Sequence, residues 1–205
     1  KKLISTFHKA KLAVILDVVY NHVGIPNHLL YLDRELYLST DDLGRLTNHS
    51  GCGNDLNCDA QPVKKMIIDS LKHWVSNYQI DGFRFDLAEL LGTELLAEIE
   101  FELKKLNPNI ILIAEPWSFR GRLPVEINQT GYSLWSDRCR ESLLAFVKEG
   151  VGKEKISSLM QGKLDPENLY PWQSIQYIES HDDYAFIDRI CSDSKTGGMH
   201  PPKNA

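Results

Sequence analysis

Four short apolar runs in this chain each end in an acidic side chain. An unpaired charge is costly to bury, so an acid at the end of a buried strand indicates that this end opens onto a polar site. Parallel strands deliver their carboxyl ends to one face of an α/β barrel, where side chains from several strands meet. The four runs therefore predict one shared polar pocket. They cover residues 12–17, 82–86, 110–115 and 175–182, and their acids are Asp17, Asp86, Glu115 and Asp182.

The elements that must position these acids alternate between strands and helices. Continuous apolar runs are typical of strands buried in a parallel sheet, and apolar residues at helical spacing predict the helices between them. Pro62 suits a first helical turn, and Thr93 is a plausible N-cap of the next helix. The predicted strands cover residues 12–17, 81–86, 110–115, about 131–135 and 174–180. The predicted helices cover residues 62–79, 93–106, 138–149 and 153–160.

This alternation predicts an α/β fold made of βαβ units around a parallel sheet. We expect a (β/α)8 TIM barrel, present as a partial fragment of about strands three to seven, because five strands are recognisable where a closed barrel has eight. Residues 1–205 would then be the central part of one catalytic barrel domain. Residues 19–61 form a long polar loop insertion after strand three, and loops of this length in a compact domain are usually functional.

Composition excludes some classes of partner. The formal net charge of -5 argues against nucleic acid, and no apolar run approaches the roughly 20 residues of a membrane span. Localisation stays open, with a cytoplasmic location favoured, because signals upstream of Lys1 could have been lost. The 4 cysteines are too few for a disulfide scaffold. Free thiols are the favoured state of Cys52 and Cys58, and a small disulfide loop is the alternative.

The four acidic runs resemble the four short motifs of the α-amylase family of glycoside hydrolases. Any one of them alone would be weak evidence, but all four occur in the order of the family between residues 17 and 182. The resemblance implies a barrel enzyme that acts on α-glucan polysaccharides or oligosaccharides. The matching segments are Asp17-Val18-Val19-Tyr20-Asn21-His22, Gly82-Phe83-Arg84-Phe85-Asp86, Ile113-Ala114-Glu115-Pro116-Trp117 and Glu179-Ser180-His181-Asp182.

The resemblance assigns three catalytic residues. Retaining glycosidases need a carboxylate nucleophile and a carboxylic acid that protonates the departing oxygen, about 5 Å apart. Asp86 matches the nucleophile, and Arg84, two residues earlier on the same face of the strand, would favour its ionised form. Glu115 matches the general acid/base, and partly apolar surroundings would favour its protonated form. Asp182 matches the acid that binds sugar hydroxyls and stabilises the oxocarbenium-like transition state.

Other motif residues are expected to bind substrate or to support the catalytic acids. His22 and His181 would bind sugar hydroxyls. The aromatic rings of Tyr20 and Trp117 would stack on sugar rings. Asp17 and Asn21 would support the network around the nucleophile. The residues expected to bind substrate are Tyr20, His22, Arg84, Trp117 and His181.

No cofactor is expected to be required, and we assign no metal ligands. Calcium is possible, because Asn21 matches an asparagine that helps to bind a structural calcium in many α-amylases. The long loop also offers oxygen ligands, which calcium prefers, although surface solvation explains them equally well. These residues are Asp33, Asp41, Asp42, Asn54 and Asp55.

Residues 51–57, followed by Pro62 and Val63, and residues 135–140 resemble the isoamylase, glycogen-debranching and pullulanase-type members of the family. The implied reaction is hydrolysis of α-1,6 branch linkages of glycogen or starch through a covalent glycosyl-enzyme intermediate. One alternative is an α-glucan branching enzyme, in which a sugar hydroxyl completes the second half-reaction. Another is a non-catalytic carbohydrate-binding relative, against which the presence of Asp86, Glu115 and Asp182 argues. With only part of the barrel, we expect the isolated chain to be inactive and poorly stable.

Overall fold

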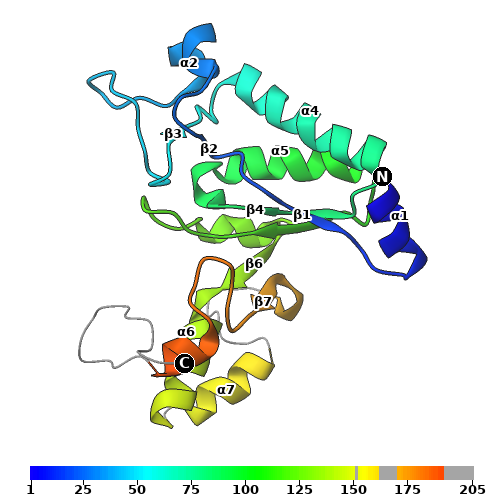
Figure 1. Ribbon diagram of the computed structural model, residues 1–205, viewed down its shortest axis with the longest axis vertical. Coiled ribbons are helices and arrows are strands. Elements are labelled where there is room, and N and C mark those ends of the chain that lie inside the picture. Colours follow the sequence, from blue (N-terminus) through cyan, green and yellow to red (C-terminus); the bar gives the residue numbers. More distant parts are fainter. Residues whose placement is uncertain (151, 162–169, 192–205) are drawn as a thin grey trace. The chain divides into compact units, whose positions relative to one another are not determined.

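The computed structural model describes residues 1–150, 152–161 and 170–191 of the chain (Figure 1). The chain divides into two compact units, Lys1–Leu134 and Trp135–Ala205. Three of the predicted strand-end acids, Asp17, Asp86 and Glu115, belong to the first unit, and Asp182 belongs to the second. None of the helices among the described residues combines the length and the apolar character that crossing a membrane requires.

The first unit is built on parallel strands. Register pairs join Ile15 to Gly82 and Gly82 to Ile111, so each strand enters the sheet at the same level. Gly82 has to be a glycine, because a Cβ atom at this position would lie 2.4 Å from the carbonyl oxygen of Ile111. The α/β prediction is confirmed, with shorter strands than expected. The sheet order is β1 (Ile15–Val18), β4 (Gly82–Phe85), β5 (Ile111–Ala114), β6 (Ser133–Ser136) and β7 (Ser174–Gln176), the last from the second unit.

Two helices, α4 (Gln61–Tyr78) and α5 (Thr93–Lys104), pack side by side next to these strands (Figure 1). Their apolar stripes are buried at helical spacing, which confirms the predicted period of both helices. Pro62 lies in the first turn of α4, as predicted. The prediction for Thr93 was wrong: Gly92, with a φ of 78°, is the N-cap, and Thr93 is the first helical residue. The core side chains of the pair include Val63, Ile67, Leu71, Leu95, Leu96, Ile99 and Leu103.

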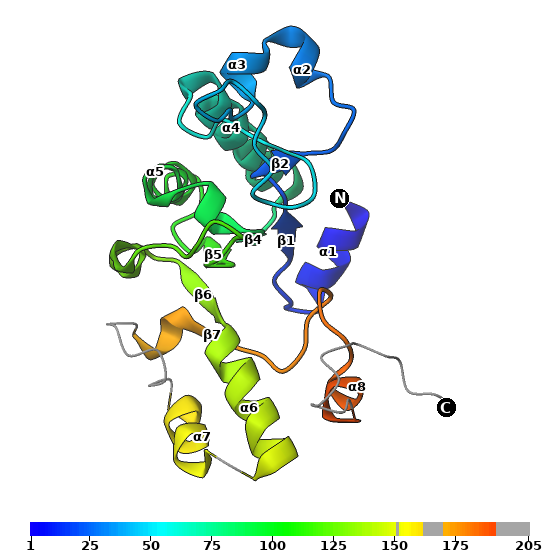
Figure 2. The same cartoon turned by 90° about the vertical axis from the view of Figure 1, so that its left-hand side faces the viewer.

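Helix α1 (Lys2–Lys9) precedes β1 (Figure 2), and the side chain of Asp81 contacts both the helix and the residue before the strand. The carboxylate of Asp81 accepts a hydrogen bond from the backbone N–H of Val14 at 2.7 Å. The same oxygen of Asp81 lies 2.8 Å from Nε2 of His8, in α1. Because Asp81 immediately precedes β4, these two contacts align the entry points of β1 and β4.

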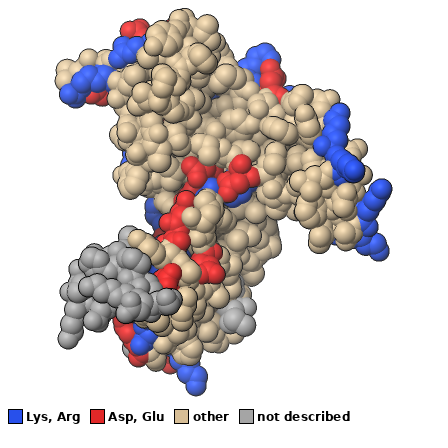
Figure 3. All heavy atoms as spheres, viewed as in Figure 1, with Lys and Arg blue, Asp and Glu red and all other residues tan. Residues whose placement is uncertain are grey.

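Among the described residues drawn in Figure 3, Lys and Arg side chains appear as small separate groups.

The predicted loop insertion, residues 19–61, contains four short elements. β2 (His22–Val23) and β3 (Asn54–Asp55) pair antiparallel, with His22 opposite Asp55. A Cβ atom at Gly53 would lie 2.2 Å from the carbonyl oxygen of Val23, so only glycine permits this approach. The remaining elements are the single-turn helices α2 (Leu29–Leu32) and α3 (Arg34–Tyr37). The segment thus folds back on itself, and its first paired strand begins at His22, directly after Asn21.

The second unit contains α6 (Asp137–Glu149), α7 (Lys153–Met160), β7 and α8 (Phe186–Cys191). The hydroxyl of Ser136 caps α6 by accepting a hydrogen bond from the backbone N–H of Cys139. Arg140 of α6 pairs with Asp183 at 2.6 Å and lies over the ring of Tyr177. These contacts tie the segment after β7 to α6. All four cysteines are free thiols, which confirms the prediction for Cys52 and Cys58.

Candidate active site

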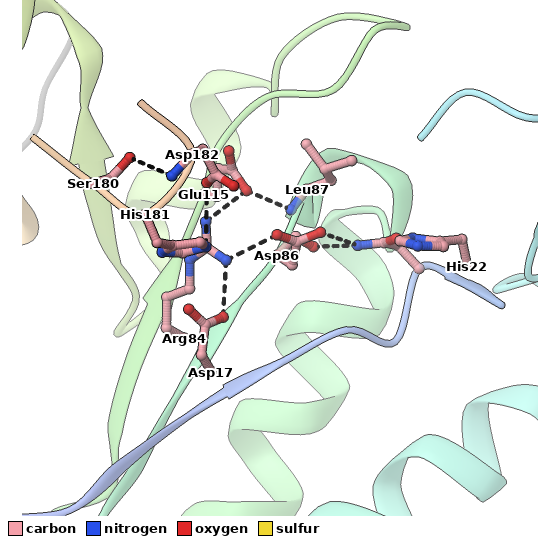
Figure 4. A network of polar contacts seen from close by, with 10 residues as sticks. Asp17, His22, Arg84, Asp86, Leu87, Glu115, Ser180, His181 and Asp182 are labelled. Carbon is pink, nitrogen blue, oxygen red and sulfur yellow. Dashed lines mark hydrogen bonds and ion pairs between the residues drawn. The ribbon is translucent and has the colours of Figure 1, made fainter. Parts of the chain in front are cut away.

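Two acids of the first unit follow directly after neighbouring strands. Asp86 follows β4 and Glu115 follows β5, and the preceding residues, Phe85 and Ala114, are register partners. Because the strands are parallel, both acids leave the sheet at its carboxyl-terminal edge. Asp17, inside β1, is the register partner of Arg84 on β4. The sheet therefore brings together three of the four acids that the sequence predicts to meet (Figure 4).

The guanidinium group of Arg84 lies at the centre of these acids. Its Nη1 donates to Asp17 Oδ1 at 2.8 Å and to Asp86 Oδ1 at 2.9 Å, and its Nη2 donates to Glu115 Oε2 at 2.8 Å. Burial lowers the pKa of Arg84, but the hydrogen bond to Asp17 and the charges of Glu115, Asp17 and Asp86 raise it above its ordinary value. Arg84 is therefore a permanent cation that donates hydrogen bonds to all three carboxyl groups.

Exposure differs strongly among the four charged side chains. Arg84 and Glu115 are 5% and 7% exposed, Asp86 is 19% exposed and Asp17 is 47% exposed. Asp86 thus has a face that a substrate can reach while its other side is held by the protein. Asp17 reaches solvent and contacts only the arginine among these groups, and its supporting role stays a prediction.

The environment of Glu115 is more polar than the sequence suggests. Its Oε2 accepts a hydrogen bond from Arg84 and a second from the backbone N–H of Leu87, at 2.8 Å. The carboxyl group is buried, as expected, but charged and polar donors hold it rather than the apolar residues that precede it in sequence. Sequence reasoning missed Leu87, because no sequence pattern reports a backbone N–H that is aimed at a distant side chain.

Asn21 has a clear position next to the nucleophile candidate. It is fully buried, and its side-chain amide donates to the backbone oxygen of Asp86 and, at 3.3 Å, to Asp86 Oδ2. Its Oδ1 in turn contacts Nδ1 of His22. Asn21 therefore fixes both the backbone and the carboxylate of Asp86, and it links His22 to the same network.

Three acids of the 19–61 segment have local partners. Asp33 caps α3 through the backbone N–H of Leu36, and Asp41 pairs with Arg45 at 2.7 Å. Asp55 is buried and accepts a hydrogen bond from the backbone N–H of His49 at 2.7 Å. Among the described residues, no group of three His, Cys, Asp or Glu side chains could hold a metal ion. Caps and turns therefore account for the positions of Asp33, Asp41 and Asp55.

The two aromatic candidates of the first unit are held by protein contacts. The hydroxyl group of Tyr20 is 2.7 Å from that of Ser70 on α4, so the ring has a fixed position. The guanidinium group of Arg122 lies 5.4 Å from the ring centroid of Trp117, and the two residues form a β-bridge. One face of Trp117 is therefore occupied by a cation, which restricts sugar stacking to its other face.

His181 and Asp182 belong to the second unit and are described within it. Both side chains are more than half exposed, and His181 Nε2 lies 3.3 Å from Asp182 Oδ2. The ring of His181 also packs edge-on against Trp135, with centroids 6.3 Å apart. The two residues thus form a solvent-accessible pair, and their contact with a substrate stays a prediction.

A parallel α/β sheet that presents two carboxylates and an arginine at adjacent carboxyl ends places polar groups where α/β-barrel enzymes carry their active sites. No protein-family model matches the chain. Individual proteins do match: isoamylase 3, chloroplastic, of Oryza sativa is 33% identical over 223 residues, which cover 93% of this chain and 27% of the relative. A glycogen operon protein GlgX homolog of Haemophilus influenzae is 32% identical, and the matched region covers 100% of this chain and 34% of the relative.

A solved structure agrees with these relatives. The pullulanase of Paenibacillus barengoltzii, in complex with maltohexaose and α-cyclodextrin, has a TM-score of 0.82 and 30% identity over 92% of this chain and 33% of its own. The chain is a homologue of isoamylase, GlgX and pullulanase proteins, in agreement with the resemblance of its motifs to the α-amylase family. The predicted barrel fold class is thereby confirmed. The chain spans about a third of the length of these relatives.

Proposed function

We propose that the full-length protein is a retaining glycoside hydrolase that cleaves α-1,6 branch linkages of glycogen or starch. The observation that carries this proposal is the network in which Arg84 joins Asp86 and Glu115 at neighbouring strand ends. It supplies a held carboxylate with a reachable face and a second, buried carboxyl group beside it. Two such groups are the minimum that retaining hydrolysis requires.

In the proposed reaction, Asp86 attacks the anomeric carbon while Glu115 donates a proton to the departing glycosidic oxygen. The bond between Asp86 and the sugar forms as the glycosidic bond breaks, which leaves a covalent glycosyl-enzyme and an ionised Glu115. Glu115 then takes a proton from water, whose oxygen displaces Asp86. Arg84 and Asn21 orient Asp86 by donating hydrogen bonds to its carboxylate oxygens.

The remaining residues are assigned to substrate contacts. Asp182 and His181 would bind hydroxyls of the reacting sugar, and Asp182 would stabilise the oxocarbenium-like transition state. His22, held by Asn21, would bind hydroxyls of the same ring. Tyr20 and the open face of Trp117 would stack on neighbouring sugars.

The relatives support the substrate class. The matching pullulanase was solved with maltohexaose and α-cyclodextrin, which are α-glucans, and the other relatives are named as an isoamylase and a glycogen operon protein. Isoamylase and pullulanase are debranching enzymes, so an α-1,6 linkage is the proposed target. The two carboxyl groups supply both the nucleophile and the proton, so we propose that no cofactor is required, and a structural calcium stays a prediction.

The proposal is tested with the full-length protein on amylopectin and on linear amylose. We expect release of linear chains from amylopectin, no shortening of amylose, and loss of at least about 10⁴-fold in kcat for Asp86→Asn, because the nucleophile is removed. A matched control is Asp69→Asn, on the exposed face of α4, where the acid only pairs with Lys65. Transfer of chains into new branches would show a branching enzyme, and binding without turnover would show a non-catalytic relative; either result overturns the proposal.

A further inference from the structure

The residue directly after Asp86 has an unusual backbone conformation. Leu87 has a φ of 37° and a ψ of 51°, in the left-handed region that L-residues other than glycine, asparagine and aspartate rarely adopt. A strained conformation of this kind persists only where the surrounding structure maintains it, and such residues cluster at functional sites. Leu87 is one of three described residues other than glycine with a positive φ, and the other two, Lys11 and Gln79, end helices or turns away from the acids.

The left-handed turn aims two successive amide groups at one residue. The N–H of Leu87 donates to Glu115 Oε2 at 2.8 Å, and the N–H of Ala88 donates to the backbone oxygen of Glu115 at 2.9 Å. Successive N–H groups around a left-handed residue form a concave site that favours an anionic group. Just before the turn, the N–H of Asp86 donates to the backbone oxygen of Val18 at 3.1 Å, so the strand register holds until the turn begins.

Two groups donate hydrogen bonds to Glu115 Oε2, and neither of them can accept a proton. Arg84 is a permanent cation and donates through Nη2, and the Leu87 amide has only an N–H to offer (Figure 4). A proton on Oε2 would face both donors and would displace at least one of them. The acid form of Glu115 therefore carries its proton on Oε1.

We propose that Leu87 is a positioning residue, whose left-handed backbone amide holds Oε2 of Glu115 and so directs the transferable proton to Oε1. This inference rests on the proposed role of Glu115 as general acid/base. A hydrogen bond to the ionised carboxylate also favours its charged form. The Leu87 amide thus sets both the oxygen that delivers the proton and the pH above which Glu115 no longer donates it.

The direct test replaces the Leu87 amide by an ester, through incorporation of the matching α-hydroxy acid into the full-length protein. This change removes one N–H and keeps the leucine side chain. We expect a loss of about tenfold or more in kcat/KM on a branched glucan and a shift of the alkaline limb of the pH profile upward by about one unit. The matched control is the same ester at Leu90, whose N–H donates only to the backbone oxygen of Leu87. This control should not move the alkaline limb.

A second substrate separates this inference from the proposed function. The leaving group of α-maltosyl fluoride needs no proton, so kcat/KM for the fluoride should fall much less in the Leu87 ester than kcat/KM for the glycosidic bond. Equal losses on both substrates would show a merely structural role and would overturn the inference. Absence of wild-type hydrolysis on both substrates would overturn the proposed function itself.

Two ordinary substitutions keep the inference testable if the ester protein cannot be folded. Glycine adopts the left-handed region freely and keeps the N–H, whereas the β-branched side chain of isoleucine strongly disfavours it. Leu87→Ile should lose at least about tenfold more kcat/KM on the glycosidic bond than Leu87→Gly. Equal activities of the two variants would contradict a role for the left-handed conformation.

Discussion

Replacement of Arg84 by methionine is the perturbation that most clearly reports the electrostatics of the site. Methionine has a similar unbranched stem and no charge, so Arg84→Met removes the guanidinium group with a small change in packing. The guanidinium group that lies at hydrogen-bond distance from Asp17, Asp86 and Glu115 is lost. Three carboxylates then remain close together, and two of them are shielded from solvent.

The expected magnitude follows from the exposure of each partner. Removing one partner of a buried ion pair costs about 3–5 kcal/mol, because the other charge is left uncompensated. Asp17 is 47% exposed and can turn to solvent, so its contribution is that of a surface pair, below about 1 kcal/mol. The cost comes mainly from Glu115 and Asp86, which are 7% and 19% exposed. We expect Arg84→Met to lower the free energy of unfolding at pH 7 by about 3–5 kcal/mol.

The assay is urea unfolding of the full-length protein and its variant at pH 7 and at about pH 4.5. The loss should be smaller at the lower pH, because protonation of the crowded carboxylates removes their mutual repulsion in the variant. Arg45→Met is the matched control, since Arg45 forms an exposed pair with Asp41, and its stability should stay near that of the wild type. A loss below about 1 kcal/mol for Arg84→Met, or one that does not depend on pH, would refute the reasoning.

Two further predictions follow from shifted pKa values elsewhere in the first unit. Hydrogen bonds from Lys105 and Lys72 lower the pKa of Glu102 from 4.5 to about 2. The stability that they confer is present above about pH 4.5 and is lost as the pH falls towards 2, so the Tm difference between wild type and Glu102→Gln should shrink between pH 5 and pH 3. A constant difference would contradict this assignment. Burial raises the pKa of Cys58 to about 12. A thiol reagent at about pH 8 should therefore modify the exposed Cys52 and leave Cys58 intact until urea unfolds the protein; equal labelling of both in the native state would be the opposite result.

Much of the site is encoded in short-range sequence patterns. An apolar run that ends in an acid marks a strand and its carboxyl end together, which is why Asp86 and Glu115 were predicted on adjacent strands. The spacing of Arg84 and Asp86 likewise requires both side chains to lie on one face of β4. Parallel register then brings Asp17 opposite Arg84. These features follow from the period of a strand and need no knowledge of the tertiary contacts.

Other features depend on contacts between distant segments and have no local signature. Leucine has no preference for a left-handed φ, so Leu87 becomes visible only when the chain around Glu115 is in place. Thr93 is a favourable cap by residue type, but the left-handed φ of Gly92 turns the chain one residue earlier. The pairing of His22 with Asp55 across the 19–61 segment depends on the close approach that Gly53 allows. In each case a tertiary contact overrides the local propensity.

The central claim is that Asp86 forms the covalent bond to the sugar. A fluorinated maltosyl fluoride, which forms a glycosyl-enzyme that turns over slowly, should label the full-length protein once per chain. Peptide mass mapping should then find the sugar on the peptide that contains Asp86, and Asp86→Asn should abolish the labelling. A sugar attached to any other carboxylate, or an enzyme that hydrolyses its glucan without forming the adduct, would contradict the account.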